Sequence, residues 1–96
     1  MADTKIRYKH FEIRRPTYLG AVPEGRENDW DIVKWSDNFE HCWSIAFLRW
    51  NPKEPCYELE SVGMRLLEEM EDGLPQFIMK WVEFQETLRC LERNDI

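Results

Sequence analysis

The sequence contains no apolar stretch long enough to span a membrane. A transmembrane helix needs about 20 consecutive, mainly apolar residues, and no segment of this 96-residue chain approaches that pattern. The first ten residues, MADTKIRYKH, carry charges where a secretory signal peptide has its apolar region. We therefore expect no membrane contact and a cytoplasmic location.

Cysteine and histidine are scarce, and their spacing matches no metal site. The three cysteines, Cys42, Cys56 and Cys90, include no CxxC pair and are odd in number, which is typical of reduced thiols. His10 and His41 are the only histidines. The glycine-rich phosphate loop and the GxSxG and HExxH motifs are also missing. The sequence therefore predicts no metal, no cofactor and no enzymatic activity.

Large side chains, by contrast, are plentiful. Hydrophobic residues make up 43% of the chain and aromatic residues 14%, which is enough for a folded core and argues against disorder. The length fits one domain covering residues 1–96. A domain of this size gains burial readily by self-association, so a homo-oligomer is a further expectation.

The charge of the chain is unevenly distributed. The net charge is −6, yet residues 1–15 carry +3 and the remaining 81 residues carry −9. An acidic body is repelled by nucleic-acid phosphates and attracted to basic surfaces. We therefore expect a partner with a basic surface and no direct binding to nucleic acid.

The N-terminal segment, residues 1–15, alternates in the manner of a strand. Ile6 and Tyr8 fall on one phase of the alternation and Phe11 and Ile13 on the other. This change of phase predicts a single basic strand with a bulge near His10.

A loop and three further strands follow. Residues 16–29 are rich in proline, glycine and charge, which predicts the longest exposed connection. Segments 30–36, 41–50 and 56–62 are short, rich in aromatic or β-branched residues, and separated by turn residues. Strands joined this closely pair with their neighbours, so residues 30–62 are predicted to form an antiparallel meander.

Two helices are predicted over residues 64–93. The first begins after Gly63 and stops at Gly73, a residue suited to the left-handed position after a helix. The second starts at Leu74 and Pro75. Its apolar residues recur at spacings of four, three, four and three. They are Phe77, Trp81, Phe84, Leu88 and Leu91, with Ile78 and Val82 beside them.

These elements predict an α+β fold, in which a small antiparallel sheet of three to four strands packs against the C-terminal amphipathic helix. In the strand at 41–50, Trp43, Ile45 and Phe47 share one phase. We expect this face to meet the helix stripe, so that Trp43, Phe47, Trp81 and Phe84 belong to the core.

Three tryptophans stand apart from this pattern. Trp30, Trp35 and Trp50 lie at strand ends, beside a charge or a turn, where an indole ring is half exposed. Tryptophan is enriched at interaction hot spots. These residues therefore either pack at the rim of the core or belong to an interface or ligand surface.

The segment CWSIAFLRWNPKEPCYELESVGMRLLEE, Cys42 to Glu69, resembles the middle of small phage and prophage accessory proteins without a characterised activity. It covers about a third of the chain. The resemblance implies a short protein made inside a bacterium, and such proteins often bind and block a host factor, including defence proteins. It assigns no target and no binding residues.

Two functions from different classes follow. The first is a non-enzymatic antagonist that binds a host protein through an acidic surface bearing Trp30, Trp35, Trp50, Glu58 and Glu60. The second is an oligomeric sponge for a nucleotide or another phosphate-bearing ligand, held by Arg7, Tyr8, Lys9, Arg14 and Arg15, with Trp35 or Trp50 as further stacking residues. A structural or regulatory phage component that only self-assembles is a third.

Overall fold

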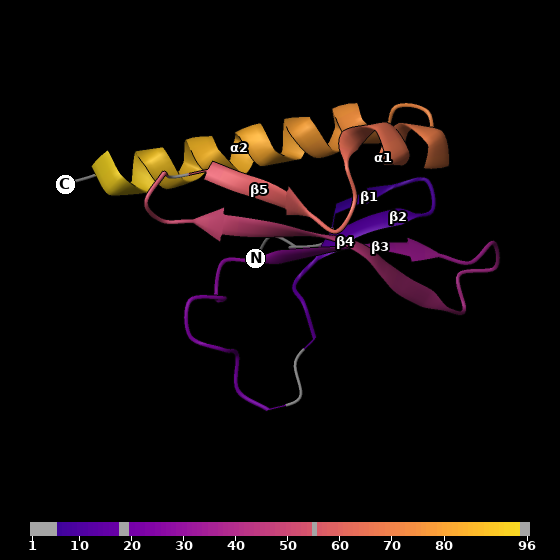
Figure 1. The fold of residues 1–96 in the computed structure, drawn as a ribbon, viewed down its shortest axis with the longest axis horizontal. Coiled ribbons are helices and arrows are strands. Elements are labelled where there is room, and N and C mark those ends of the chain that lie inside the picture. The colour runs from indigo at the N-terminus through magenta and orange to yellow at the C-terminus, as the bar shows by residue number, and fades with distance from the viewer. Residues whose placement is uncertain (1–5, 18–19, 55, 95–96) are drawn as a thin grey trace.

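The fold is α+β, as the sequence predicts. The structure, a computed structural model, describes residues 6–17, 20–54 and 56–94 (Figure 1). The first five residues of the predicted strand 1–15 thus lie outside the described residues. The strands are β1 (Ile6–Tyr8), β2 (Phe11–Arg14), β3 (Trp30–Trp35), β4 (Cys42–Asn51) and β5 (Cys56–Glu60), and the helices are α1 (Met64–Met70) and α2 (Leu74–Asn94).

The strands form one antiparallel sheet in the order β1-β2-β3-β4-β5, so every strand pairs with its neighbour in sequence. Both helices lie on one side of this sheet, and the connection between β2 and β3 projects on the other side (Figure 1). We call the side that carries the helices the inner side and the opposite one the outer side.

The N-terminal segment is a hairpin, and the prediction of one bulged strand is wrong. Tyr8 of β1 pairs with Phe11 of β2, so only Lys9 and His10 form the turn. Lys9 has a φ of 55°, a left-handed conformation that is uncommon for lysine and gives no turn signal in the sequence. The change of phase at His10 marks a reversal of the chain, which raises the strand count to five.

The core lies between the inner side of the sheet and α2. Burial of large apolar side chains in this layer is the main source of stability for so small a domain. The buried cluster consists of Phe11, Ile13, Trp30, Ile32, Ala46, Leu48, Tyr57, Leu67, Leu74, Ile78, Trp81 and Val82.

The face of β4 that enters the core differs from the prediction. Ala46 and Leu48 are buried, whereas Trp43 is 49% exposed and Phe47 38% exposed. Ile45 is partly buried against the core. The assignment of Trp43 and Phe47 to the core is therefore wrong.

A β-bulge at Ile45 explains the difference. Ile32 of β3 pairs with Ala46 and Val33 pairs with Ser44, which leaves Ile45 without a partner on β3. Such an extra residue shifts the alternation of the strand by one position. Trp43 therefore lies on the inner side, beyond the core cluster, and Phe47 lies on the outer side.

The helix stripe is buried only in its first half. Trp81 is 6% exposed, as predicted, but Phe84 and Leu91 are each 60% exposed, so the assignment of Phe84 to the core is wrong. The buried apolar residues of α2 are Leu74, Ile78, Trp81 and Val82, which share one face of the helix. Phe84 and Leu91 lie to one side of this face, so the predicted stripe runs along its edge and does not coincide with it.

The junction between the helices depends on Gly73. Its φ is 86°, the left-handed conformation that the sequence predicts. A Cβ atom at this position would lie 2.6 Å from the Tyr8 hydroxyl oxygen. That hydroxyl donates a hydrogen bond to the Asp72 carbonyl oxygen at 3.0 Å, which fixes β1 against the helix junction.

Candidate partner-binding surface

The outer side of the sheet carries polar and aromatic side chains that the helices leave uncovered. Side chains alternate between the two sides of a strand. Since Ile32, Leu48 and Tyr57 belong to the core, their neighbours Val33, Phe47 and Glu58 point outward.

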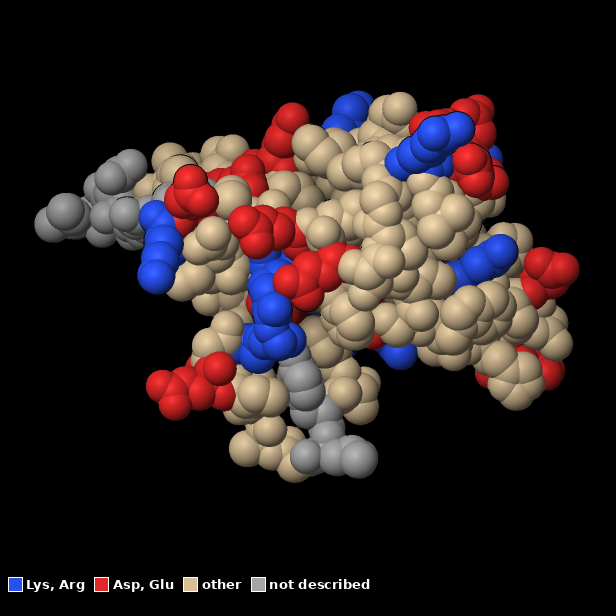
Figure 2. All heavy atoms as spheres, in the orientation of Figure 1, with Lys and Arg blue, Asp and Glu red and all other residues tan. Residues whose placement is uncertain are grey.

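Phe47 is the exposed apolar centre of this surface. It is 38% exposed and pairs with Asp31 of β3 and Glu60 of β5. One step along the sheet, Arg49 pairs with the exposed Glu58. We call Phe47, Arg49, Glu58 and Glu60 the Phe47 patch. Acidic side chains gather over β5 and α2 around a smaller basic group (Figure 2).

The charges of the Phe47 patch are only partly paired within the chain. An Arg49 guanidinium nitrogen lies 3.1 Å from Glu60 Oε2. Glu58 accepts a long hydrogen bond, 3.4 Å, from the Asn51 side-chain amide. Exposed ion pairs contribute about 0–1 kcal/mol each, so these carboxylates are available to a basic partner at little cost.

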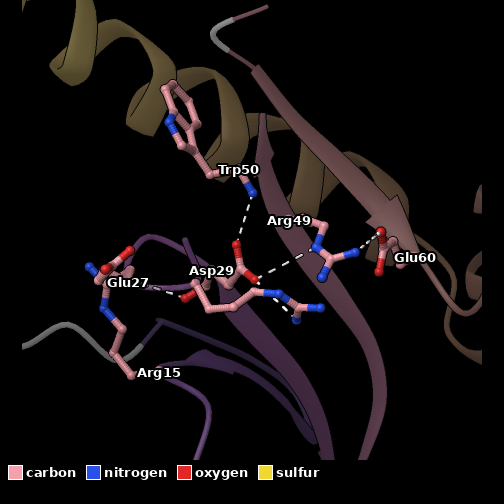
Figure 3. Close-up of polar contacts among 7 residues, drawn as sticks. Arg15, Glu27, Asp29, Arg49, Trp50 and Glu60 are labelled. Carbon is pink, nitrogen blue, oxygen red and sulfur yellow. Dashed lines mark hydrogen bonds and ion pairs between the residues drawn. The ribbon is translucent and has the colours of Figure 1, made fainter. Parts of the chain in front are cut away.

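Asp29, immediately before β3, anchors the loop to this surface (Figure 3). Its Oδ1 accepts a hydrogen bond from the backbone N–H of Trp50 at 3.0 Å. Its Oδ2 lies 3.5 Å from an Arg26 guanidinium nitrogen and 4.0 Å from Arg49 Nε. The carboxylate is buried, and burial raises its pKa above the ordinary 3.8. Asp29 therefore positions Arg49 in the Phe47 patch.

Asp31 supports the same surface from β3. It is buried on the outer side and accepts a hydrogen bond from the Ser44 hydroxyl at 2.6 Å. Burial raises the pKa of Asp31, and the hydrogen bond from Ser44 opposes this shift. The hydrogen bond between Asp31 and Ser44 therefore joins β3 to β4 next to Phe47.

Trp35 lies on the outer side, at the end of β3 opposite to Trp30, and is half-buried. Its indole N–H donates to Glu12 Oε1 at 2.8 Å. The Arg7 guanidinium carbon lies 5.6 Å from the ring centroids of both Trp35 and Phe39. Internal partners therefore hold this ring at its observed position.

Trp30 does not belong to a surface, contrary to the expectation of half exposure. It is 4% exposed. Its indole N–H donates to the Tyr57 hydroxyl at 3.2 Å, and its ring packs edge-on against Trp81 with centroids 4.9 Å apart. Since Trp30 begins β3 on the inner side, α2 covers it.

Trp50 is half-buried at the rim of the core, also on the inner side. It packs edge-on against Tyr57 at 5.0 Å, and the Arg89 guanidinium carbon lies 4.9 Å from its centroid. Trp30 and Trp50 therefore both contact Tyr57 on the inner side, whereas Trp35 lies on the outer side. Among the sequence-predicted partner-binding residues, Glu58 and Glu60 lie together on the outer side of one strand.

The residues predicted to hold a phosphate ligand are also dispersed. Tyr8 stacks on Phe77 with centroids 5.1 Å apart. Lys9 Nζ lies 3.0 Å from Glu71 Oε2, and this ion pair raises the pKa of Lys9. Both side chains face the helix junction, while Arg7 lies on Trp35.

The Arg14 and Arg15 side chains contact different parts of the chain, away from Tyr8 and Lys9. Arg14 donates to the Cys42 sulfur at 3.5 Å. Arg15 donates to the carbonyl oxygens of Glu27 and Asp29, and its guanidinium carbon lies 3.8 Å from the Trp30 ring centroid. The five basic and aromatic residues therefore form no single site within one chain.

Phe47, Arg49 and Asp29 are surface or anchoring residues that the sequence patterns do not predict as such. The alternation along residues 41–50 predicts a core position for Phe47, because the bulge at Ile45 has no sequence signal. Asp29 falls in residues 16–29, which the composition predicts only as an exposed connection. The one local sign of its role in the sequence is Arg26, three residues earlier, with which Asp29 forms an ion pair.

Comparisons with known proteins identify no relative of the chain: no family model, no curated protein and no solved structure matches it.

In the described part of the chain, no group of three or more histidine, cysteine, aspartate or glutamate side chains has the geometry of a metal site. No helix of the described residues has the length and apolarity needed to cross a membrane.

Proposed function

We propose that the protein is a non-enzymatic, phage-type accessory protein that binds a basic surface of a host protein inside the bacterial cell and antagonises it. A defence protein is the expected class of target. The resemblance of the segment Cys42 to Glu69 supplies the phage setting, and the Phe47 patch supplies the binding surface.

The observation that supports the proposal is the position of Phe47. An exposed aromatic ring beside Glu60, with Glu58 two residues earlier on the same strand, offers an apolar anchor next to acidic side chains on the side of the sheet without helices. Interfaces commonly combine such an aromatic centre with a polar rim. The net charge of −6 favours association with a basic partner.

The alternative of a ligand sponge has weaker geometric support. Its five residues lie in separate environments, and Tyr8 and Lys9 are engaged with Phe77 and Glu71. A phosphate site would therefore need residues from more than one chain. Native mass spectrometry of the purified protein, which detects a copurified nucleotide, tests this alternative directly.

Affinity capture from bacterial lysate tests the proposal. We expect the parent chain to retain a protein that the Glu58→Lys/Glu60→Lys variant does not retain. The matched control is Glu68→Lys/Glu69→Lys, which makes the same change of charge at two exposed positions of α1. Loss of capture by the control but not by the β5 variant would place the binding surface elsewhere and refute the proposal.

A further inference from the structure

The edge of the sheet at β5 is only partly covered. β5 is the last strand of the sheet, and its neighbour in the sheet is β4. On the side away from β4, Glu86 of α2 accepts a hydrogen bond from the Tyr57 N–H at 2.8 Å. An edge strand presents backbone N–H and C=O groups with which a further strand can pair. Glu86 therefore covers one such group at the start of β5.

Leu59 carries the uncovered part of this edge. In an antiparallel pair, the backbone groups of alternate residues point to the same side. The Leu59 N–H and C=O therefore point away from β4, as the Tyr57 N–H does. Within the described part of the chain, no residue forms a hydrogen bond with these two groups. Leu59 thus offers one donor and one acceptor to another chain.

A hollow lies beside Leu59 on the flank of α2, which runs in the opposite direction to β5 (Figure 1). Two residues of a strand advance about 6.6 Å, the length of about four residues of helix. Leu59 therefore lies level with the turn of α2 that precedes Glu86. That turn contributes Glu83 to two adjoining surface hollows, one of which is also lined by Met64 and Met79. Side chains of a further strand have room there.

The edge at β5 is acidic. Four carboxylate side chains border it, Glu58 and Glu60 on β5 and Glu83 and Glu86 on α2. Two basic side chains lie among them: Arg49, which is paired with Glu60, and Lys80, which lines a hollow with Glu83. In the turn before β5, Lys53 and Glu54 are opposite in charge. Carboxylates therefore outnumber basic side chains at this edge.

The thiol of Cys56, at the start of β5, lies in this negative potential. Partial burial raises the pKa of the thiol, and the carboxylates of Glu58, Glu86 and Glu54 raise it further. A negative potential attracts a positively charged partner.

The same charges exclude a second copy of the chain from this edge. Antiparallel pairing of two β5 strands at Leu59 would set Glu58 of one copy opposite Glu60 of the other. Like charges directly opposite each other are destabilising, whereas opposite charges contribute favourably. The edge therefore fits a strand with lysine or arginine at the positions that face Glu58 and Glu60.

We propose that the basic partner contributes an extended segment that pairs with β5 at Leu59 and becomes a sixth strand of the sheet. Its basic side chains lie on the outer side next to Glu58 and Glu60, and the side chains between them enter the hollow that Met79 lines. Backbone hydrogen bonds supply affinity in this mode of recognition, and alternate side chains supply specificity. The inference rests on the proposed function, because the added strand extends the outer side next to the Phe47 patch.

Amide hydrogen exchange at Leu59, followed by NMR, tests the inference. The probe is a synthetic peptide that alternates lysine and valine. At about ten times its Kd, the peptide should slow exchange of the Leu59 amide about 10-fold, because the bound strand accepts this N–H. A peptide that alternates glutamate and valine should leave the exchange unchanged. Absence of protection at Leu59 up to about 5 mM of the lysine–valine peptide would overturn the inference.

Methylation of the valine nitrogens distinguishes strand pairing from charge attraction alone. When the lysines face the outer side, the backbone groups of the valines point to β5. The methylated peptide keeps its charge but lacks these donors and is bulkier at the paired edge, so it should no longer protect Leu59. Equal protection by the two peptides would refute strand pairing.

Two charge variants relate this test to the proposed function. Glu58→Lys/Glu60→Lys should lose the protection of Leu59 by the lysine–valine peptide, and Glu68→Lys/Glu69→Lys should retain it. Capture of a host protein that depends on Glu58 and Glu60, without protection of Leu59 in the complex, overturns the added strand alone. Protection of Leu59 by the peptide, with capture that depends only on Glu68 and Glu69, refutes the proposed function and supports the basic-strand site at β5.

Discussion

The two sides of the sheet differ although the same strands form both. On β4, Leu48 is buried against α2, whereas Phe47, the residue before it, is 38% exposed. The inner side carries the apolar core, while the outer side combines carboxylates and arginine with the exposed Phe47 and the half-buried Trp35. Stability therefore resides mainly on the inner side, and the outer side is free to vary its chemistry for binding.

The largest effect is expected on the inner side. Trp81→Ala removes a buried ring that contacts Trp30 and should lower the free energy of unfolding by about 3–5 kcal/mol. Phe84→Ala, three residues later on an exposed flank, should change it by less than about 0.5 kcal/mol in a monomeric sample. Urea unfolding measures both. Similar losses for the two variants would contradict the assigned burial of α2.

A smaller decrease in the free energy of unfolding is expected at Asp29, where the connection between β2 and β3 joins the sheet. Asp29→Ala leaves the Trp50 N–H without its acceptor and should cost about 1–3 kcal/mol. Asp29→Asn retains an acceptor oxygen and removes a buried charge. Its free energy of unfolding, measured in urea, should therefore decrease less than that of Asp29→Ala. If Asp29→Asn proves as destabilising as Asp29→Ala, the carboxylate charge itself, through Arg26 and Arg49, is the stabilising element.

The pH dependence of stability tests the burial of Asp31 on the outer side. Burial raises the pKa of Asp31 above 3.8 in the folded state, so the folded chain holds this proton more tightly than the unfolded chain. The contribution of Asp31 to stability therefore decreases as the pH rises from about 4 through the folded pKa. Asp31→Asn removes this decrease.

We expect the stability of Asp31→Asn relative to the parent to increase over that pH range and then to level off. Urea unfolding from about pH 4 to about pH 7 measures the difference. A constant difference between Asp31→Asn and the parent would contradict the raised pKa.

The smallest effect on stability is expected at the acidic rim. Glu58→Lys/Glu60→Lys should change the free energy of unfolding by about 0.5 kcal/mol or less, because exposed ion pairs contribute little. Thermal unfolding followed by circular dichroism checks this. A large loss would show that the Arg49–Glu60 pair is part of the stable framework.

Local patterns in the sequence predicted much of the fold but only part of the surface. The short segment 56–62 bounded by turn residues predicts β5, and Gly73 predicts the division between α1 and α2, as the structure confirms. The hairpin at Lys9 and the bulge at Ile45 depend on pairing between strands. Neither has a local sequence signal, and the bulge decides that Phe47 points outward.

The central claim, that Phe47 anchors a partner on the outer side, is tested most directly by one pair of affinity measurements. Phe47→Ala and Trp43→Ala both remove an exposed aromatic ring from β4, but from opposite sides of the sheet. Each variant is titrated against the purified protein that the parent chain captures. Phe47→Ala should raise Kd about 10-fold or more, as for an interface hot spot, while Trp43→Ala leaves Kd within about 2-fold of the parent value. The opposite result, a weakened Trp43→Ala and an unaffected Phe47→Ala, would contradict the account.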